Sequence, residues 1–201
     1  MTFQAHLNSV RFKWRTTLLS AILLFWLASV AASDTDAKNK IYQAWPKTPA
    51  SQAFFEARHD VLLDLTTDYI GDFKYQSPHH FALVYRKPIT GQLERDGETV
   101  RFSFPDRKGS IPLSQVPEIA AFLTPIQALL SGDPKALETQ YHVRYQAMPD
   151  DGWQLNYQPK VSGFSVQQVQ VEGRWQGQKV QLETIELNFA NGDWRRYRFE
   201  P

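Results

Sequence analysis

The sequence has no cysteine among its 201 residues. A chain without cysteine forms no disulfide, has no thiolate for catalysis or metal binding, and has no residue to which a lipid could be attached after a signal peptide. We therefore expect a soluble, unanchored product. Its stability must come from a packed core, which the chain length and a hydrophobic content of 42% allow.

Catalytic signatures are missing as well. There is no G-x-S-x-G nucleophile motif, and the neighbouring carboxylates Asp150 and Asp151 lie between a proline and a glycine, where turn formation explains them. His79 and His80 are the one pair of adjacent histidines, but neighbours on a strand point to opposite faces and cannot easily bind one ion. The sequence thus predicts no enzyme, no metal site and no cofactor.

Acidic residues are absent from residues 1–32, which carry three basic residues before the apolar run TLLSAILLFWLASVAAS. This layout is typical of a secretory signal peptide, and Val30 and Ala32 are suitably small for a signal peptidase. We expect cleavage after Ala32 and export to the periplasm. The alternative is an uncleaved N-terminal anchor, although the run is short for a bilayer span.

A basic surface is also lacking. Residues 1–32 hold three of the 22 basic residues and none of the 21 acidic ones, so the remainder has 19 basic and 21 acidic residues and a formal charge of −2. Only Arg195, Arg196 and Arg198 cluster, as expected for solvated strand residues. Nucleic acid is therefore not expected as a partner.

Alternating aromatic residues dominate the stretch Gly71–Phe104, which predicts consecutive antiparallel strands. Asp96-Gly97 tolerates positive φ at both central turn positions, so residues 92–95 and 98–104 should form a hairpin. Pro78 and Pro88 lack a backbone donor and should mark strand ends or bends.

The remaining segments extend this pattern. A short helix is predicted over residues 38–45, ended by Pro46, and residues 51–59 fit a strand better than a helical turn. Residues 106–114 read as a loop. Residues 116–131 carry a helical apolar stripe, and Thr124-Pro125 favours two short helices over one, with Gly132 closing the second. Strands separated by turns follow from Tyr141 onward.

This succession predicts a mainly β fold with some α: an open, incomplete antiparallel β-barrel of about ten strands. Accumulated twist curls such a sheet, which leaves an apolar mouth. The stripe of residues 116–130 would cover that mouth as a lid, with Phe122, Leu123, Ile126 and Leu130 pointing into it.

Several short motifs, in this order and spacing, resemble those of the LolA family of periplasmic lipoprotein carriers. They are Gly71-x-Phe73-x-Tyr75-x-x-Pro78, Asp96-Gly97, Leu155-x-Tyr157-x-Pro159 and Gly192-Asp193. The helical insert PEIAAFLTPIQALLSGDPKALETQY is similar to divergent LolA-like members that accompany glycolipid or aryl-polyene pathways. The resemblance implies a signal peptide over 1–32 and a single carrier domain over 33–201.

The resemblance also implies a function. Such a carrier takes an acylated lipoprotein or lipid from an inner-membrane transporter and passes it to an outer-membrane receptor, and we expect it to act as a monomer. Better known carriers commonly have a basic residue before the proline matched by Pro78, where it helps to hold the lid; this chain has Ser77. His79 and Lys74 lie nearby, although a solvated role is the simpler reading of both.

On this interpretation the alternating apolar residues form the wall of a lipid-binding cavity: Phe73, Tyr75, Phe81, Leu83, Tyr85, Phe102 and Leu155. The alternative, from a different class, is a non-enzymatic periplasmic scaffold or assembly protein. Its barrel would be fully packed, and its exposed sheet edge would bind a protein partner by strand addition.

Overall fold

The computed structural model describes residues 35–45, 50–161, 163 and 165–200. The predicted signal peptide over 1–32 and the predicted helix stop at Pro46 lie outside these residues. Within the described ranges, no helix combines the length and apolarity needed to cross a membrane.

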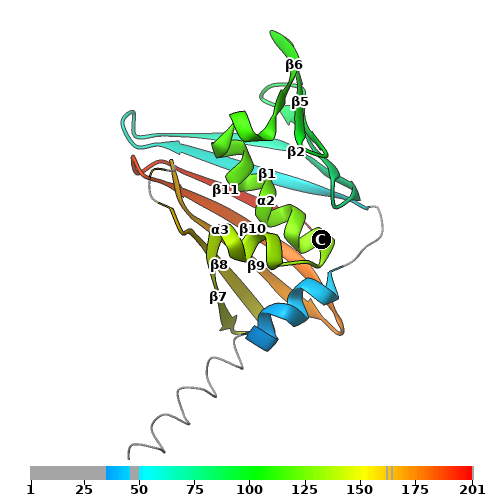
Figure 1. The fold of residues 1–201 in the computed structure, drawn as a ribbon. Helices are drawn as coiled ribbons and strands as arrows, with labels where there is room; N and C mark the ends of the chain where they lie inside the picture. Colours follow the sequence, from blue (N-terminus) through cyan, green and yellow to red (C-terminus); the bar gives the residue numbers. More distant parts are fainter. Residues whose placement is uncertain (1–34, 46–49, 162, 164, 201) are drawn as a thin grey trace, which may run out of the picture.

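One antiparallel sheet of eleven strands forms the body of the molecule, in the order β6-β5-β4-β3-β2-β1-β11-β10-β9-β8-β7 (Figure 1). The strands are β1 (Ala50–Asp60), β2 (Leu65–Ser77), β3 (His80–Lys87), β4 (Gly91–Asp96), β5 (Thr99–Phe104), β6 (Arg107–Pro112), β7 (Tyr141–Met148), β8 (Gly152–Pro159), β9 (Val166–Gln176), β10 (Lys179–Phe189) and β11 (Trp194–Phe199). Because β6 and β7 form its two edges, the curved sheet is an open barrel, which confirms the predicted fold class.

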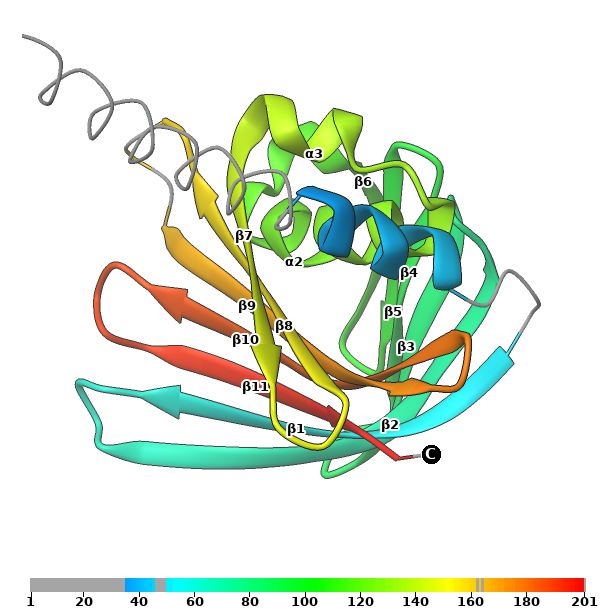
Figure 2. The same ribbon diagram turned by 90° about the horizontal axis from the view of Figure 1, so that it is seen from below.

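The helices lie inside the curve of this sheet, as Figure 2 shows. They are a helix over residues 35–44, the 3-10 turn η1 (Leu113–Gln115), α2 (Pro117–Ser131) and α3 (Lys135–Gln140). α2 ends at Gly132, whose φ of 70° and whose N–H bond to the Ala128 carbonyl oxygen (3.0 Å) form the predicted C-terminal cap.

The turn at Asp96-Gly97 gives β4 and β5 the predicted register. Asp96 pairs with Thr99 across the β4–β5 turn, where Gly97 has a φ of 61°. Residues 51–59 lie within β1, so the strand interpretation of that segment is confirmed. Pro78 lies in the β2–β3 turn, as expected of a residue that cannot donate to a ladder.

Two local predictions are wrong. Residues 107–112 form the edge strand β6 and not a loop; its side chains are mostly exposed, so the segment lacks the apolar alternation by which strands are recognised. The chain also does not break at Thr124-Pro125, because Pro125 is buried inside a continuous α2. Burial of the side chains around it compensates for the backbone hydrogen bond that proline cannot make.

Candidate functional site

α2 fills the concave side of the sheet and organises the site. Between Ala121 and Leu130 all its side chains are buried except those of Thr124 and Gln127, so the helix is covered on nearly every side. A helix that is apolar all round belongs in a core and not at a surface. Its Phe122 ring stacks on Tyr197 of β11, with centroids 4.5 Å apart.

The four residues predicted for the lid are all buried. Phe122, Leu123, Ile126 and Leu130 are at most 4% exposed and belong to one cluster with the inner residues of the sheet. Whether they move when a ligand enters stays a prediction.

An apolar pocket of about 330 Å³ opens beside the C-terminal end of α2. Leu130 of the helix meets Phe73 and Tyr75 of β2 there. The remaining wall comes from the N-terminal helix, β1 and the β9–β10 turn, and includes Trp45, Gln52, Val180 and Leu182. Its volume and mainly apolar wall are typical of small-molecule sites.

The other predicted wall residues divide into two groups. Phe81, Leu83, Tyr85 and Leu155 are buried in the core cluster and do not line this pocket. Phe102 is only half-buried; it lies on β5, two strands beyond β3, where the Arg107 guanidinium is 5.9 Å from its ring. The structure therefore brings Phe73 and Tyr75 to the pocket, buries four residues in the core, and leaves Phe102 apart.

A buried polar cluster on the concave face was not foreseen from the sequence. The Glu56 carboxylate is 1% exposed and accepts four hydrogen bonds: from Arg58 Nε (2.5 Å) and Nη2 (3.0 Å), from Tyr85 Oη (2.8 Å) and from Tyr197 Oη (2.8 Å). Every lone-pair direction of the carboxylate therefore has a strong donor, which a buried charge requires.

The charge of Glu56 acts on the groups around it. Burial raises the pKa of the Tyr85 and Tyr197 hydroxyls, and the adjacent Glu56 charge raises it further. Burial alone would lower the pKa of Arg58, but its hydrogen bonds and ion pair with Glu56 outweigh that effect and raise it. The two tyrosine hydroxyls therefore stay protonated and the Arg58 guanidinium stays charged, as the hydrogen bonds of the cluster need.

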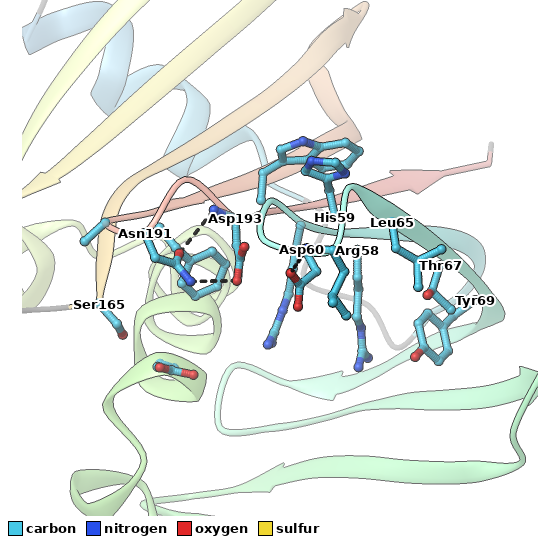
Figure 3. Close-up of a pocket in the computed structure, with 15 residues that line it drawn as sticks. Arg58, His59, Asp60, Leu65, Thr67, Tyr69, Ser165, Asn191 and Asp193 are labelled. Atoms are coloured by element: carbon cyan, nitrogen blue, oxygen red, sulfur yellow. Dashed lines mark hydrogen bonds between the residues drawn. The ribbon is translucent and has the colours of Figure 1, made fainter.

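A second pocket, of about 510 Å³, lies at the opposite end of α2 and is lined by both polar and apolar side chains. Figure 3 shows its wall, where Asn191 and Asp193 of the β10–β11 turn lie beside Asp60 at the end of β1. Glu118, in the first turn of α2, also lines it. α2 therefore lies between a mainly apolar pocket at its C-terminal end and a pocket of mixed polarity at its N-terminal end.

One polar side-chain contact joins α2 to the β2–β3 turn. Gln127 Nε2 lies 3.0 Å from His79 Nδ1, so His79 has a partner on the helix where a purely solvated role was expected. This contact sits next to Ser77, the position at which the sequence lacks the basic residue of better known carriers. Among the described residues, no group of three or more His, Cys, Asp or Glu could hold a metal ion.

An open antiparallel barrel with an internal helix and an apolar pocket defines a class of small binding proteins. The comparisons with known proteins agree with this class. The family profile described as "Outer membrane lipoprotein carrier protein LolA-like" matches residues 28–199. The chain belongs to this LolA-like family.

One solved structure shows the same fold at low sequence identity. A domain from Vibrio parahaemolyticus, provisionally named an outer membrane lipoprotein-sorting protein, superposes with a TM-score of 0.51 at 8% identity, covering 85% of this chain and 92% of that one. A LolA superfamily protein from Nitrosomonas europaea superposes with a TM-score of 0.44 at 10% identity, and the match covers 81% of this chain and 89% of that one. A search of curated protein sequences gives no match.

Proposed function

We propose that this protein is a soluble periplasmic carrier that binds the acyl chains of a lipoprotein or glycolipid and shuttles it from the inner to the outer membrane. The observation that carries the proposal is the apolar pocket at the end of α2, lined by Leu130, Phe73 and Tyr75. Membership of the LolA-like family supports it, as does the signal-like segment over 1–32.

The packing of α2 suggests how such a carrier would load and release. The concave face of the sheet is already covered by the helix, so an acyl chain entering beside Leu130 must take over contacts that α2 now makes. Each methylene buried contributes about 0.8 kcal/mol, so a long chain can offset the undocking of a helix. Cargo and helix therefore compete for one surface, and this competition allows release.

The scaffold alternative receives no support from the free edge of the sheet at β6. That strand places Arg107 and Lys108, both exposed, at the position where a partner strand would pair. Charged residues on an edge strand are a common device against strand addition. The edge at β6 therefore does not favour the scaffold alternative, and the apolar pocket favours the carrier.

Blocking the pocket tests the proposal. Gln52 lies on the pocket wall, so Gln52→Trp should fill the apolar pocket, whereas Thr67→Trp fills the second pocket, at the N-terminal end of α2, and is the matched control. We expect the protein recovered from the periplasmic fraction to yield acylated species by mass spectrometry and to bind a fluorescent fatty acid. Gln52→Trp should weaken that binding at least tenfold.

Two results would overturn the proposal. One is wild-type protein that carries no acylated species and binds no fluorescent fatty acid. The other is Gln52→Trp with unchanged affinity beside an impaired Thr67→Trp. Vesicle-to-vesicle transfer of a labelled lipopeptide then distinguishes a carrier from a protein that only stores lipid.

A further inference from the structure

The end of the β1–β2 hairpin exposes a run of large aliphatic side chains. Leu62 is 89% and Leu63 67% exposed, and Val61 and Leu65 on either side are also exposed. We call residues 61–65 the apolar tip. Contiguous apolar exposure of this kind on a folded protein marks a surface that contacts something else.

Hydrogen bonds hold the tip in this form. Asp60 Oδ1 accepts the Leu63 N–H at 3.0 Å, and Asp193 Oδ1, from the β10–β11 turn, accepts the Val61 N–H at 2.9 Å. Asp64 completes the turn with a φ of 48°. The leucine side chains therefore lie on an ordered turn that is hydrogen-bonded to the adjacent β10–β11 turn.

The tip also projects. The pairing of β2 with β3 ends at Ile70 of β2. Residues 65–69 of β2 therefore extend beyond the end of β3 toward the tip. Val161, 66% exposed, lies in the β8–β9 connection at the same end of the sheet, where the Ser165 carbonyl oxygen accepts the Ala190 N–H at 2.8 Å. The apolar exposure thus belongs to one end of the barrel.

Residues behind the tip follow a definite order along the strands. The first row behind Asp60 is aromatic: His59 pairs with Trp194, and their rings stack with centroids 5.4 Å apart. The next row pairs Arg195 with Arg58, and because the Arg58 guanidinium is already bound to Glu56, Arg195 is the cation left to meet a phosphate. At about 3.3 Å per residue, aliphatic, aromatic and cationic groups succeed one another within roughly 10 Å.

This order matches the boundary of a lipid bilayer, in which hydrocarbon gives way to an interface favoured by aromatic rings and then to phosphates. Arg195 fits the phosphate level, because it has no ion pair with any residue that the structure describes; its guanidinium lies 5.2 Å from the Phe189 ring centroid. The order of aliphatic, aromatic and cationic side chains thus follows the layers of a membrane surface.

We propose that the apolar tip inserts into the outer part of a lipid bilayer, with the His59–Trp194 pair at headgroup depth. A second copy of the chain fits less well, because the carboxylates Asp60, Asp64 and Asp193 surround the tip and would face one another across a symmetric contact. The same carboxylates limit insertion to the interface and oppose strongly anionic membranes. This inference goes beyond the proposed function, since a shuttle does not itself require membrane contact.

The absence of cysteine makes a site-specific test direct. Leu62→Cys, labelled with a polarity-sensitive fluorophore, should shift its emission to the blue on addition of phosphatidylcholine vesicles. Met148→Cys, 36% exposed at the opposite end of the sheet, is the matched control and should not shift. In flotation with the same vesicles, a double variant carrying Leu62→Asp and Leu63→Asp should bind at least tenfold less than wild type, and Asp64→Asn should bind more.

The label at position 62 reports locally, so binding of vesicles by any other part of the chain does not affect the result. An unchanged emission at position 62, or equal shifts at 62 and 148, would overturn the proposal. So would self-association that the double aspartate variant abolishes, which would assign the tip to a second copy. Binding of fluorescent fatty acid without vesicles tests the carrier function separately, so the two proposals can fail independently.

Discussion

The ring of Phe122 in α2 stacks on the ring of Tyr197 in β11, with centroids 4.5 Å apart and planes inclined by 25°. The Tyr197 hydroxyl in turn donates to Glu56 Oε1 at 2.8 Å. The internal helix therefore rests on a residue that also belongs to the buried polar cluster. Displacing α2 would open one face of that cluster to whatever replaces the helix.

Glu56→Gln should destabilise the protein by about 3 kcal/mol, because it leaves the partly buried Arg58 cation without its counter-charge. The matched control is Glu186→Gln, which breaks a solvent-facing pair with Arg196 (2.7 Å) and should cost less than about 1 kcal/mol. Urea unfolding monitored by circular dichroism measures both. Equal losses for the two variants would contradict a structural role for the cluster.

Alkaline pH should loosen the helix over residues 35–44. Burial raises the pKa of Tyr42 on this helix to about 12, although its hydrogen bond with Tyr157 (Oη–Oη 3.1 Å) lowers it in part. The tyrosine pKa is thus higher in the folded than in the unfolded chain. The stabilisation is complete below pH 10 and is lost as the pH rises from 10 toward 12, by about 2.7 kcal/mol for two pKa units.

Thermal unfolding between pH 8 and 12 measures this loss. Tyr42→Phe removes one of the buried titrating hydroxyls and should make the decline shallower by that contribution. A decline of the same steepness in Tyr42→Phe would show that other groups control alkaline stability.

Substitutions at two glycines distinguish the cost of a steric clash from the cost of an unfavourable backbone conformation. A Cβ at Gly71 would lie 2.3 Å from the Val84 carbonyl oxygen and 2.6 Å from the Phe54 ring, whereas a Cβ at Gly97 meets no atom within 4 Å. Gly97→Ala should therefore cost only about 1 kcal/mol, from its positive φ. Gly71→Ala should cost at least 2–3 kcal/mol, roughly the penalty of overpacking a core. Chemical denaturation measures the free energy of unfolding of both variants. Similar losses for the two would mean that β2 moves enough to accommodate the added methyl group at position 71.

The parts of the fold that the sequence predicted are those determined by neighbours in the chain. The alternation of Phe73 and Tyr75 and the Asp96-Gly97 turn place the central strands because side-chain period and turn chemistry act over a few residues. Edge strand β6 was missed because a strand exposed along most of its length carries no alternating pattern.

The buried polar cluster could not be predicted for a different reason. Glu56 meets Tyr85 across 29 residues and Tyr197 across 141 residues of sequence, and only the folded sheet brings β1, β3 and β11 together. The one local signal was that Glu56 and Arg58 share a strand face with Phe54, which is fully buried. In the same way, tertiary burial explains why α2 continues through Pro125.

The internal helix gives the sharpest test of how cargo would enter. Ile126 is 2% exposed, so Ile126→Asp would bury a carboxylate without a partner, at a cost of several kcal/mol unless α2 undocks. A shift of the helix around position 126 lets the new carboxylate reach water, and the strands keep their ladders. We expect the β-sheet circular dichroism to persist while binding of a fluorescent fatty acid changes and lipid transfer between vesicles is altered. Thr124→Asp, on the less buried side of the same helix, should behave like wild type. Normal lipid transfer by Ile126→Asp, or loss of the β-sheet signal, would contradict a movable helix. A helix that serves only as part of the core would either tolerate the substitution or unfold together with the sheet.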